Sequence, residues 1–207
     1  NKLTRIGVQS QDYLDRYRAL GLAERQLVLT GSVKYDGAVG ERNTPKGQAL
    51  AGYLAEIRGT RNPATIWVAG STHAPEEAIV LDAFESLSQR HPELFLILVP
   101  RHPDRFEEVA ALLESRRIPF ARRSRGTCSQ PVRVLLLDTV GELGAAWGLA
   151  DLGYVGGTLD GRRGGQSMIE PAGYGVPTVF GPHVWNFRDA ASRLIEVGGA
   201  ISVRSAA

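Results

Sequence analysis

The sequence has few residues that could support a disulfide, a metal centre or a membrane span. It contains one cysteine, Cys128, which excludes an internal disulfide and any cysteine-based metal site. The four histidines show neither HExxH nor HxxxH spacing and lie at His73, His91, His102 and His183. No run of about 18 apolar residues occurs, and no signal-peptide pattern is present. The sequence therefore predicts no transmembrane segment.

The chain also lacks a large net charge. The chain has 24 Lys and Arg residues against 22 Asp and Glu residues, a formal net charge of +2. This balance argues against nucleic acid as a partner, because binding to the phosphate backbone needs a strongly basic surface. With 43% hydrophobic and 22% charged residues, the composition is that of a globular protein with a core.

Apolar runs of strand length alternate with segments of helical period. The predicted strands cover residues 65–69, 94–99, 132–137, 153–155, 177–180 and 200–203. The predicted helices cover residues 76–90, 104–116, 142–150 and 186–197. The strand runs are continuous rather than alternating, which is typical of parallel strands covered on both faces. The order predicts a Rossmann-like, doubly wound parallel α/β sheet, which binds its ligand off the carboxyl ends of the strands.

The first part of the chain shows the same alternation once, with a strand over 4–8, a helix over 12–20 and a strand over 27–29. The polar, glycine-rich stretch GSVKYDGAVGERNTPKG follows and has the composition of a linker. We therefore expect residues 1–40 to be the tail of a preceding domain with its linker. Residues 41–207 should form a Rossmann-like nucleotide-sugar-binding domain whose regular structure begins near Asn62. Because the chain starts without methionine and stops within a βα pattern, we expect a piece of a longer protein, truncated at its C-terminus.

Five loops follow the predicted strands and should meet at one rim of the sheet. They contain GSTHAPEE, PRHP, DTVGEL, GGT and GPHVWNFRD. The fourth loop continues into RRGGQSMIEP, where two glycines let backbone N–H groups approach an anion and a helix start adds positive charge. Arg101, Arg162 or Arg163 could supply a forked donor to a phosphate, and Glu170 could accept from a ribose diol.

Other interpretations of these residues stay open. Ser167 and Glu170 also fit a capping box, although Pro171 would then cost a helix bond. Arg101 and His102 could form a surface pair. A dinucleotide fold and a P-loop are excluded, because neither GxGxxG after the first strand nor GxxxxGK[ST] is present. A late glycine-rich turn followed by a glutamate favours a sugar-nucleotide donor site.

The stretch VGGTLDGRRGGQSMIEPAGYGVPTVFGPHVWNFRD resembles 3-deoxy-D-manno-octulosonic acid (Kdo) transferases of lipid A biosynthesis. That family reads VGGS, a short loop and GGHNxLEPAxxGxPVxxGPxxxNFxD. GSVKYDG resembles its GNLKFD, GSTHAPEE its ASTHxGEE, VPRHPDRFEEV its VPRHPERF, and LLLDTVGELGAAWGLAD its DTxGELxxxYxxAD. Order and spacing agree over most of the chain.

The resemblance implies the C-terminal half of a GT-B glycosyltransferase, an enzyme with two Rossmann-like domains and a cleft between them. It implies CMP-Kdo as the donor, a lipid A precursor as the acceptor on the missing N-terminal domain, and inversion of the anomeric centre without a metal or cofactor. The general base would also lie on the missing domain, so this fragment alone is expected to be inactive. The full-length protein would act at the cytoplasmic face of the inner membrane in lipopolysaccharide biosynthesis, and the fragment is expected to be soluble.

The resemblance also assigns donor-binding residues by position. Those around the cytosine and ribose would be Arg101, His102, Gly141 and Glu142. Those at the phosphate would be Gly164, Gly165, Gln166 and Ser167, with Glu170 on the ribose hydroxyls. Those near the donor sugar would be Ser71, Thr72 and His73. Asn186 and Arg188 would lie on the rim, without an assigned role.

The chain departs from the family pattern where GGHN is replaced by GGQS. Gln166 keeps an amide donor and acceptor, whereas Ser167 keeps only a shorter hydroxyl. Arg162 and Arg163 occupy a slightly longer loop and could pair with phosphate or the Kdo carboxylate, or be solvated. Two other functions stay open: a GT-B glycosyltransferase or epimerase using a UDP-sugar, and a non-catalytic nucleotide-binding module, for which the GGQS replacement is the sequence indication.

Overall fold

The computed structural model describes residues 3–38, 40–59, 65–126, 128 and 130–205. The chain divides into two compact units, Asn1–Ala38 and Val39–Ala207. The first unit contains β1 (Ile6–Val8), α1 (Gln11–Ala19), the 3-10 turn η1 (Glu24–Gln26), β2 (Leu27–Leu29) and η2 (Val33–Tyr35). β1 and β2 pair in parallel, and Val8, Leu14 and Leu27 form a small core between them and α1.

The second unit carries the larger sheet. Its strands are β3 (Thr65–Thr72), β4 (Leu94–Pro100), β5 (Ala121–Arg122), β6 (Val134–Leu136), β7 (Leu152–Val155), β8 (Thr178–Phe180) and β9 (Ala200–Ser202). Its helices are α2 (Pro45–Arg58), α3 (Glu76–Ser88), α4 (Phe106–Ser115), α5 (Leu143–Leu149), α6 (Ile169–Gly173) and α7 (Arg188–Glu196). Two 3-10 turns are η3 (Pro103–Arg105) and η4 (Arg123–Arg125).

The strand order β5-β6-β4-β3-β7-β8-β9 makes β3 the centre of a seven-stranded sheet in which every pair is parallel. The chain first builds outward from β3 through β4 and then returns to the other side of β3 through β7. The order therefore reverses between β3 and β7, and a doubly wound sheet opens a crevice at such a switch point. The predicted doubly wound parallel α/β fold is confirmed.

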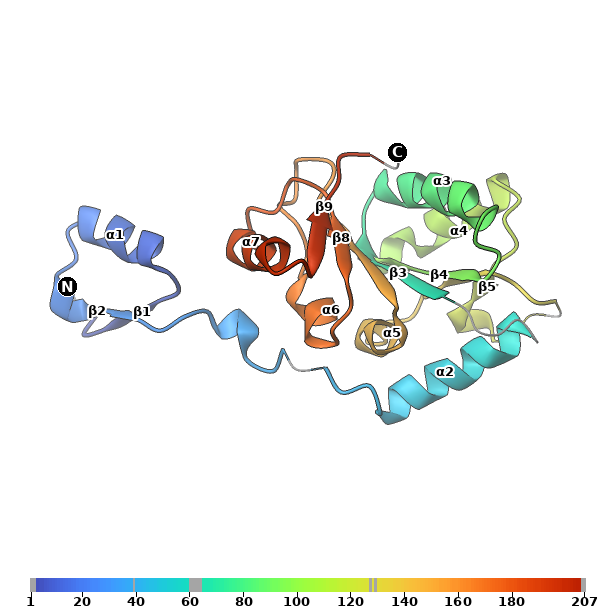
Figure 1. Cartoon of the computed structure of the whole chain (residues 1–207), viewed down its shortest axis with the longest axis horizontal. Helices are drawn as coiled ribbons and strands as arrows, with labels where there is room; N and C mark the ends of the chain where they lie inside the picture. Colours follow the sequence, from blue (N-terminus) through green and yellow to red (C-terminus); the bar gives the residue numbers. More distant parts are fainter. Residues whose placement is uncertain (1–2, 39, 60–64, 127, 129, 206–207) are drawn as a thin grey trace. The chain divides into compact units, whose positions relative to one another are not determined.

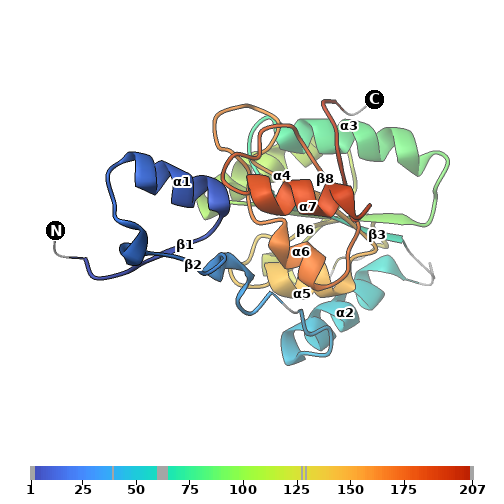
Figure 2. The same ribbon diagram turned by 60° about the vertical axis from the view of Figure 1, so that its left-hand side comes forward.

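Helices cover both faces of this sheet (Figures 1 and 2). On one face, α3 and α4 bury Leu81, Phe84 and Leu113 against strand residues that include Leu96 and Tyr154. On the other face lie α2 and α5. There the Trp147 ring presses on Gly70, where a Cβ would meet the indole at 2.3 Å. Burial on both faces explains why the strand sequences are continuously apolar.

The expectation that the regular structure of the main domain begins near Asn62 is wrong. Asn62 itself lies outside the described residues, but α2 precedes it and belongs to the second unit. The linker-like stretch supplies the start of this helix, since Thr44 caps the Gly47 N–H at 3.0 Å and Pro45 occupies the first turn. The fully buried Leu50, Leu54 and Ile57 then form its inward stripe.

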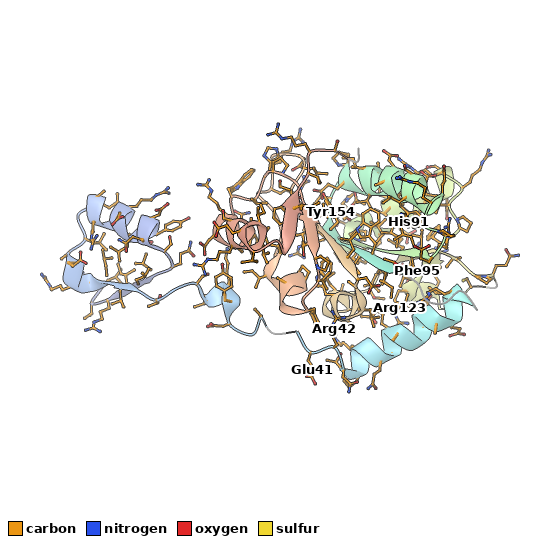
Figure 3. The ribbon with its side chains drawn as sticks, viewed as in Figure 1. Glu41, Arg42, His91, Phe95, Arg123 and Tyr154 are labelled. Carbon is orange, nitrogen blue, oxygen red and sulfur yellow. The ribbon has the colours of Figure 1, made fainter. Side chains whose placement is uncertain are left out.

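The segment before α2 is held against α5 and the end of α6. The Arg42 guanidinium donates to the carbonyl of Gly148 at 2.7 Å and to that of Tyr174 at 2.7 Å. Arg42 and α5 are found together beneath the sheet in Figure 3. Gly40 lies against the Tyr174 ring, so closely that a Cβ would stand 2.4 Å from it.

Candidate functional site

A buried carboxylate lies at the centre of the rim, where the strands end. Glu76, the first residue of α3, is 1% exposed. Five groups donate to its two oxygens at 2.7 to 3.1 Å: the backbone N–H groups of His73, Gly157, Thr158 and Leu159, and the hydroxyl of Tyr154. Burying a carboxylate costs several kcal/mol unless such donors replace its water. Glu76 therefore ties the loop after β3 to the loop after β7, across the switch point.

Gly156 lets these two loops touch. A Cβ on Gly156 would lie 2.4 Å from the Ser71 carbonyl oxygen and 2.6 Å from the Cα of Thr72, closer than non-bonded atoms approach. Ser71 has a φ of 55°, and the pairing of β3 with β4 shifts register between Gly70 and Thr72. A left-handed residue that is not glycine marks local backbone strain, which proteins concentrate at functional sites.

Two histidines lie in the loops after neighbouring strands: His73 follows β3, and His102 follows β4. His73 is 4% exposed, and its ring meets the ring of the exposed His102 edge to face, with centroids 5.3 Å apart. Burial, and second the positive charge of Arg163, lower the pKa of His73 from 6.5 to about 4. His73 is therefore a neutral imidazole at physiological pH.

A cation and a carboxylate flank Gln166 on this rim. The exposed Arg101 donates from Nε to the Gln166 Oε1 at 3.2 Å. Glu170 is exposed at the start of α6, yet the protein around its carboxylate raises its pKa by desolvation, against the opposing effects of Arg101 and the Ser167 hydroxyl. The structure thus brings together residues that the sequence assigned to phosphate and to ribose.

The glycine-rich turn is held by the loop after β8. Gly164 and Gly165 have φ values of 74° and 89°, and a Cβ on Gly164 would lie 2.2 Å from the Trp185 indole nitrogen. Asn186 donates its backbone N–H to the Gly164 carbonyl at 3.0 Å and its side-chain amide to the Arg163 carbonyl at 2.7 Å. Asn186, which the sequence placed on the rim without a role, fixes the shape of this turn.

Two backbone N–H groups that were expected to face a phosphate are already used. Gly165 donates to the Gly157 carbonyl at 2.8 Å, and Gln166 donates to the Gly156 carbonyl at 3.1 Å. These bonds hold the turn against the loop after β7. Within the described part of the chain, the N–H groups of Ser167, Met168 and Ile169 have no acceptor.

The capping-box interpretation of this segment is wrong. The residue before α6 is Met168, and no side chain caps the helix. The Ser167 hydroxyl interacts with the Glu170 carboxylate rather than with a backbone N–H. Because α6 starts at Ile169, Pro171 lies in its first turn and costs no helical hydrogen bond.

A second cluster of charged side chains lies around the loop after β6. Arg123 donates to the Glu142 carboxylate through Nε at 3.2 Å and Nη2 at 3.1 Å, and the Thr139 hydroxyl donates to the same carboxylate. Burial raises the pKa of Glu142, but the Thr139 and Arg123 hydrogen bonds outweigh it and hold the pKa below its ordinary value. Lys46 of α2 donates to the Gly141 carbonyl at 3.1 Å.

The assigned residues thus form a central group and two flanks. The central group consists of Ser71, Thr72, His73, Arg101, His102, Gln166, Ser167 and Glu170. One flank, after β6, holds Gly141 and Glu142, and the other holds Gly164, Gly165 and Asn186. Arg188 begins α7 and is exposed. Sequence reasoning missed Glu76, which reads as an ordinary acid at a helix start, and Arg123 and Lys46, whose partners are distant in sequence.

The described residues contain no group of three or more His, Cys, Asp or Glu side chains that could hold a metal ion. Among them there is also no helix long and apolar enough to cross a membrane.

Curated relatives match the chain along its length. It is 35% identical to the 3-deoxy-D-manno-octulosonic acid transferase of Haemophilus influenzae over 208 residues, 100% of this chain and 47% of that protein. It is 36% identical to the enzyme of the same name from Bordetella pertussis over 205 residues, 96% and 45% of the two chains. The chain therefore spans about half the length of the curated relatives it matches. No protein-family model matches it.

Solved structures match as well. The C-terminal CMP-Kdo binding domain of WaaA from Acinetobacter baumannii has 31% identity and a TM-score of 0.70, covering 78% of this chain and 83% of that one. The UDP-GlcNAc 2-epimerase of Methanocaldococcus jannaschii has a TM-score of 0.58 over 97% of this chain and 51% of its own, and at 13% identity it supports the fold alone.

The sheet order, with its switch point between β3 and β7, and these matches define the C-terminal domain of a GT-B protein. The chain belongs to the family of Kdo transferases and corresponds to the C-terminal half of its members.

The lowered pKa of His73 predicts that acid weakens the fold. The unfolded state binds a proton at His73 near pH 6.5 and the folded state only near pH 4, so this part of the unfolding free energy is complete above pH 6.5 and is lost as the pH falls toward 4. The full effect is about 3 kcal/mol.

Urea unfolding between pH 7 and pH 4.5 should show a steeper loss of unfolding free energy for the wild-type chain than for His73→Gln. The exposed His91→Gln is the matched control, and parallel wild-type and His73→Gln curves would contradict the assignment.

Proposed function

We propose that residues 39–207 are the donor-binding domain of a Kdo transferase and bind CMP-Kdo at the rim between β3 and β7. The observation that carries this proposal is the grouping of Arg101, Gln166 and Glu170 at the switch point of a sheet. The similarity to the C-terminal CMP-Kdo binding domain of WaaA from Acinetobacter baumannii supports it.

Each part of the donor has a matching group on the rim. The Arg101 guanidinium, which is always charged, would bind the phosphate. Glu170 would accept hydrogen bonds from the ribose hydroxyls, as acidic residues do in nucleotide folds. The cytosine would lie toward Gly141, and the Kdo moiety would lie near His73.

The same groups would assist departure of CMP. As the bond between the anomeric carbon and the phosphate oxygen breaks, its electron pair stays on that oxygen, where negative charge develops. Arg101 and the N–H groups of Ser167 to Ile169 are fixed before reaction, and one preset donor of this kind lowers a barrier by about 3–4 kcal/mol.

The attacking hydroxyl of the acceptor must lose a proton, which requires a general base. We place that base, and the site for a lipid A precursor, in the half of the relatives that this chain does not match. The whole enzyme would then act in lipopolysaccharide biosynthesis at the cytoplasmic face of the inner membrane.

Calorimetric titration of the chain with CMP, UMP, UDP and AMP tests the donor assignment. We expect CMP to bind most tightly. Arg101→Ala and Glu170→Ala should each weaken CMP binding by about tenfold or more, since each removes a charged hydrogen-bonding partner. Arg90→Ala and Glu114→Ala are matched controls, because both residues are exposed and lie after α3 and in α4, at the amino-terminal edge of the sheet. Tighter binding of UDP than of CMP would contradict the assignment and favour a UDP-sugar enzyme.

The chain by itself should transfer no Kdo. Among the described residues of the rim, no base is placed for an incoming hydroxyl, because the lowered pKa of His73 makes it a weak base whose Nε2 faces the Gln166 amide, and the Glu76 oxygens already accept five hydrogen bonds. Incubation with CMP-Kdo and a lipid A precursor, followed by mass spectrometry of the lipid, should detect no product. Transfer above the no-protein background would overturn the placement of the base in the other half.

A further inference from the structure

The side-chain amide of Gln166 bridges two residues of the rim. Its Oε1 accepts from the Arg101 Nε at 3.2 Å, and its Nε2 lies 3.4 Å from the His73 Nε2. Gln166 is half-buried and is anchored through its backbone to Gly156. One amide therefore faces a cation on one side and an imidazole on the other.

The chemistry of Arg101 fixes the direction of both contacts. A guanidinium has only donors, so the amide oxygen must face Arg101. The amide nitrogen then faces His73, and because it can only donate, the His73 Nε2 must accept. A neutral imidazole with an accepting Nε2 carries its proton on Nδ1. The geometry thus selects one tautomer of His73.

The charged and titratable groups around His73 also favour its neutral form. Arg163 after β7, Arg105 of η3 and the neighbouring His102 oppose a positive charge on the ring. Glu76 favours such a charge, but its oxygens already accept five hydrogen bonds. Burial of the His73 ring also lowers its pKa and so favours the neutral form.

We propose that Gln166 is a positioning residue that sets the tautomer of His73 and the orientation of Arg101 together. A protonated His73 would donate from Nε2 and turn the amide around, which would place the amide NH2 against the Arg101 donors. The Gln166 amide cannot accept from Arg101 and from a protonated His73 in one orientation. The rim therefore presents the Arg101 cation beside a neutral His73 imidazole. This arrangement suits a phosphate group whose charge is met by Arg101 and not by His73.

The proposal also explains the GGQS sequence as a working replacement. A neutral histidine offers one donor and one acceptor, the same pair that the glutamine amide offers. The histidine of the GGHN pattern could bridge Arg101 and His73 in the same way.

Long-range proton–nitrogen NMR of the histidine rings in the whole chain at pH 7, without ligand, tests the tautomer. In the wild type, the His73 Nδ1 should carry the proton and Nε2 should show the shift of an unprotonated nitrogen. Gln166→Glu has the same shape and still accepts from Arg101, but it offers His73 an acceptor instead of a donor. His73 should then carry a proton on Nε2. Gln166→His should keep the wild-type tautomer, and His91 in the same spectra is the internal control.

Two results would overturn the proposal: a proton on the His73 Nε2 in the wild type, or the same His73 tautomer in Gln166→Glu as in the wild type.

A second experiment, the titration of these variants with CMP, rests on the proposed function. Loss of both contacts in Gln166→Leu should raise the dissociation constant for CMP about tenfold, and Gln166→His should restore it to within about threefold. If no variant binds CMP, the donor assignment fails, while the ring spectra still decide the role of Gln166.

Discussion

The structure of the rim depends on the buried Glu76 carboxylate. An unpaired carboxylate in this position would destabilise the fold, and five donors make the burial tolerable. Four of these donors are backbone N–H groups, and they come from loops on both sides of the switch point. The carboxylate therefore mainly fixes the position of the backbone. Gly156 is required because the joined loops leave no room for a Cβ.

The remaining parts of the site follow in order from this junction. With the loop after β7 in place, the carbonyls of Gly156 and Gly157 hold the N–H groups of Gln166 and Gly165. The turn so fixed points Gln166 toward Arg101 and His73. If this rim binds the donor as proposed, its polar groups are already in place before a nucleotide arrives, and preset polar groups stabilise developing charge without reorganising during reaction.

Much of the fold follows from the sequence because its signals are local. Continuous apolar runs such as LFLILV indicate buried parallel strands, and the strand-end rule correctly gathers His73, Arg101 and Gln166 on one rim. The helix α2 was missed because its capping residues lie in a polar, glycine-rich stretch that also fits a linker. Leu50, Leu54 and Ile57 do recur at helical spacing, but the polar, glycine-rich residues before them led the whole stretch to be interpreted as a linker.

The site was less predictable for a related reason. Whether a backbone N–H is free depends on partners from other segments, so the use of the Gly165 and Gln166 amides could not be foreseen from the turn itself. Glu76 looks like a common first-turn acid, and its role is visible only once the fold brings Gly157 and Thr158, from the loop after β7, against its carboxylate. The pairing of Arg123 with Glu142 joins two elements in the same way.

Amide hydrogen exchange at Gly157, Thr158 and Leu159 tests the central role of Glu76 most directly. These residues lie in a loop, where unpaired amides exchange rapidly. We expect the three amides to be protected nearly as well as the Leu96 amide in the sheet, and to lose this protection in Glu76→Ala, which removes both acceptor oxygens, while Leu96 stays protected. Rapid exchange of the three amides in the wild-type chain would contradict the account, because the loop would then be held by something other than the buried carboxylate.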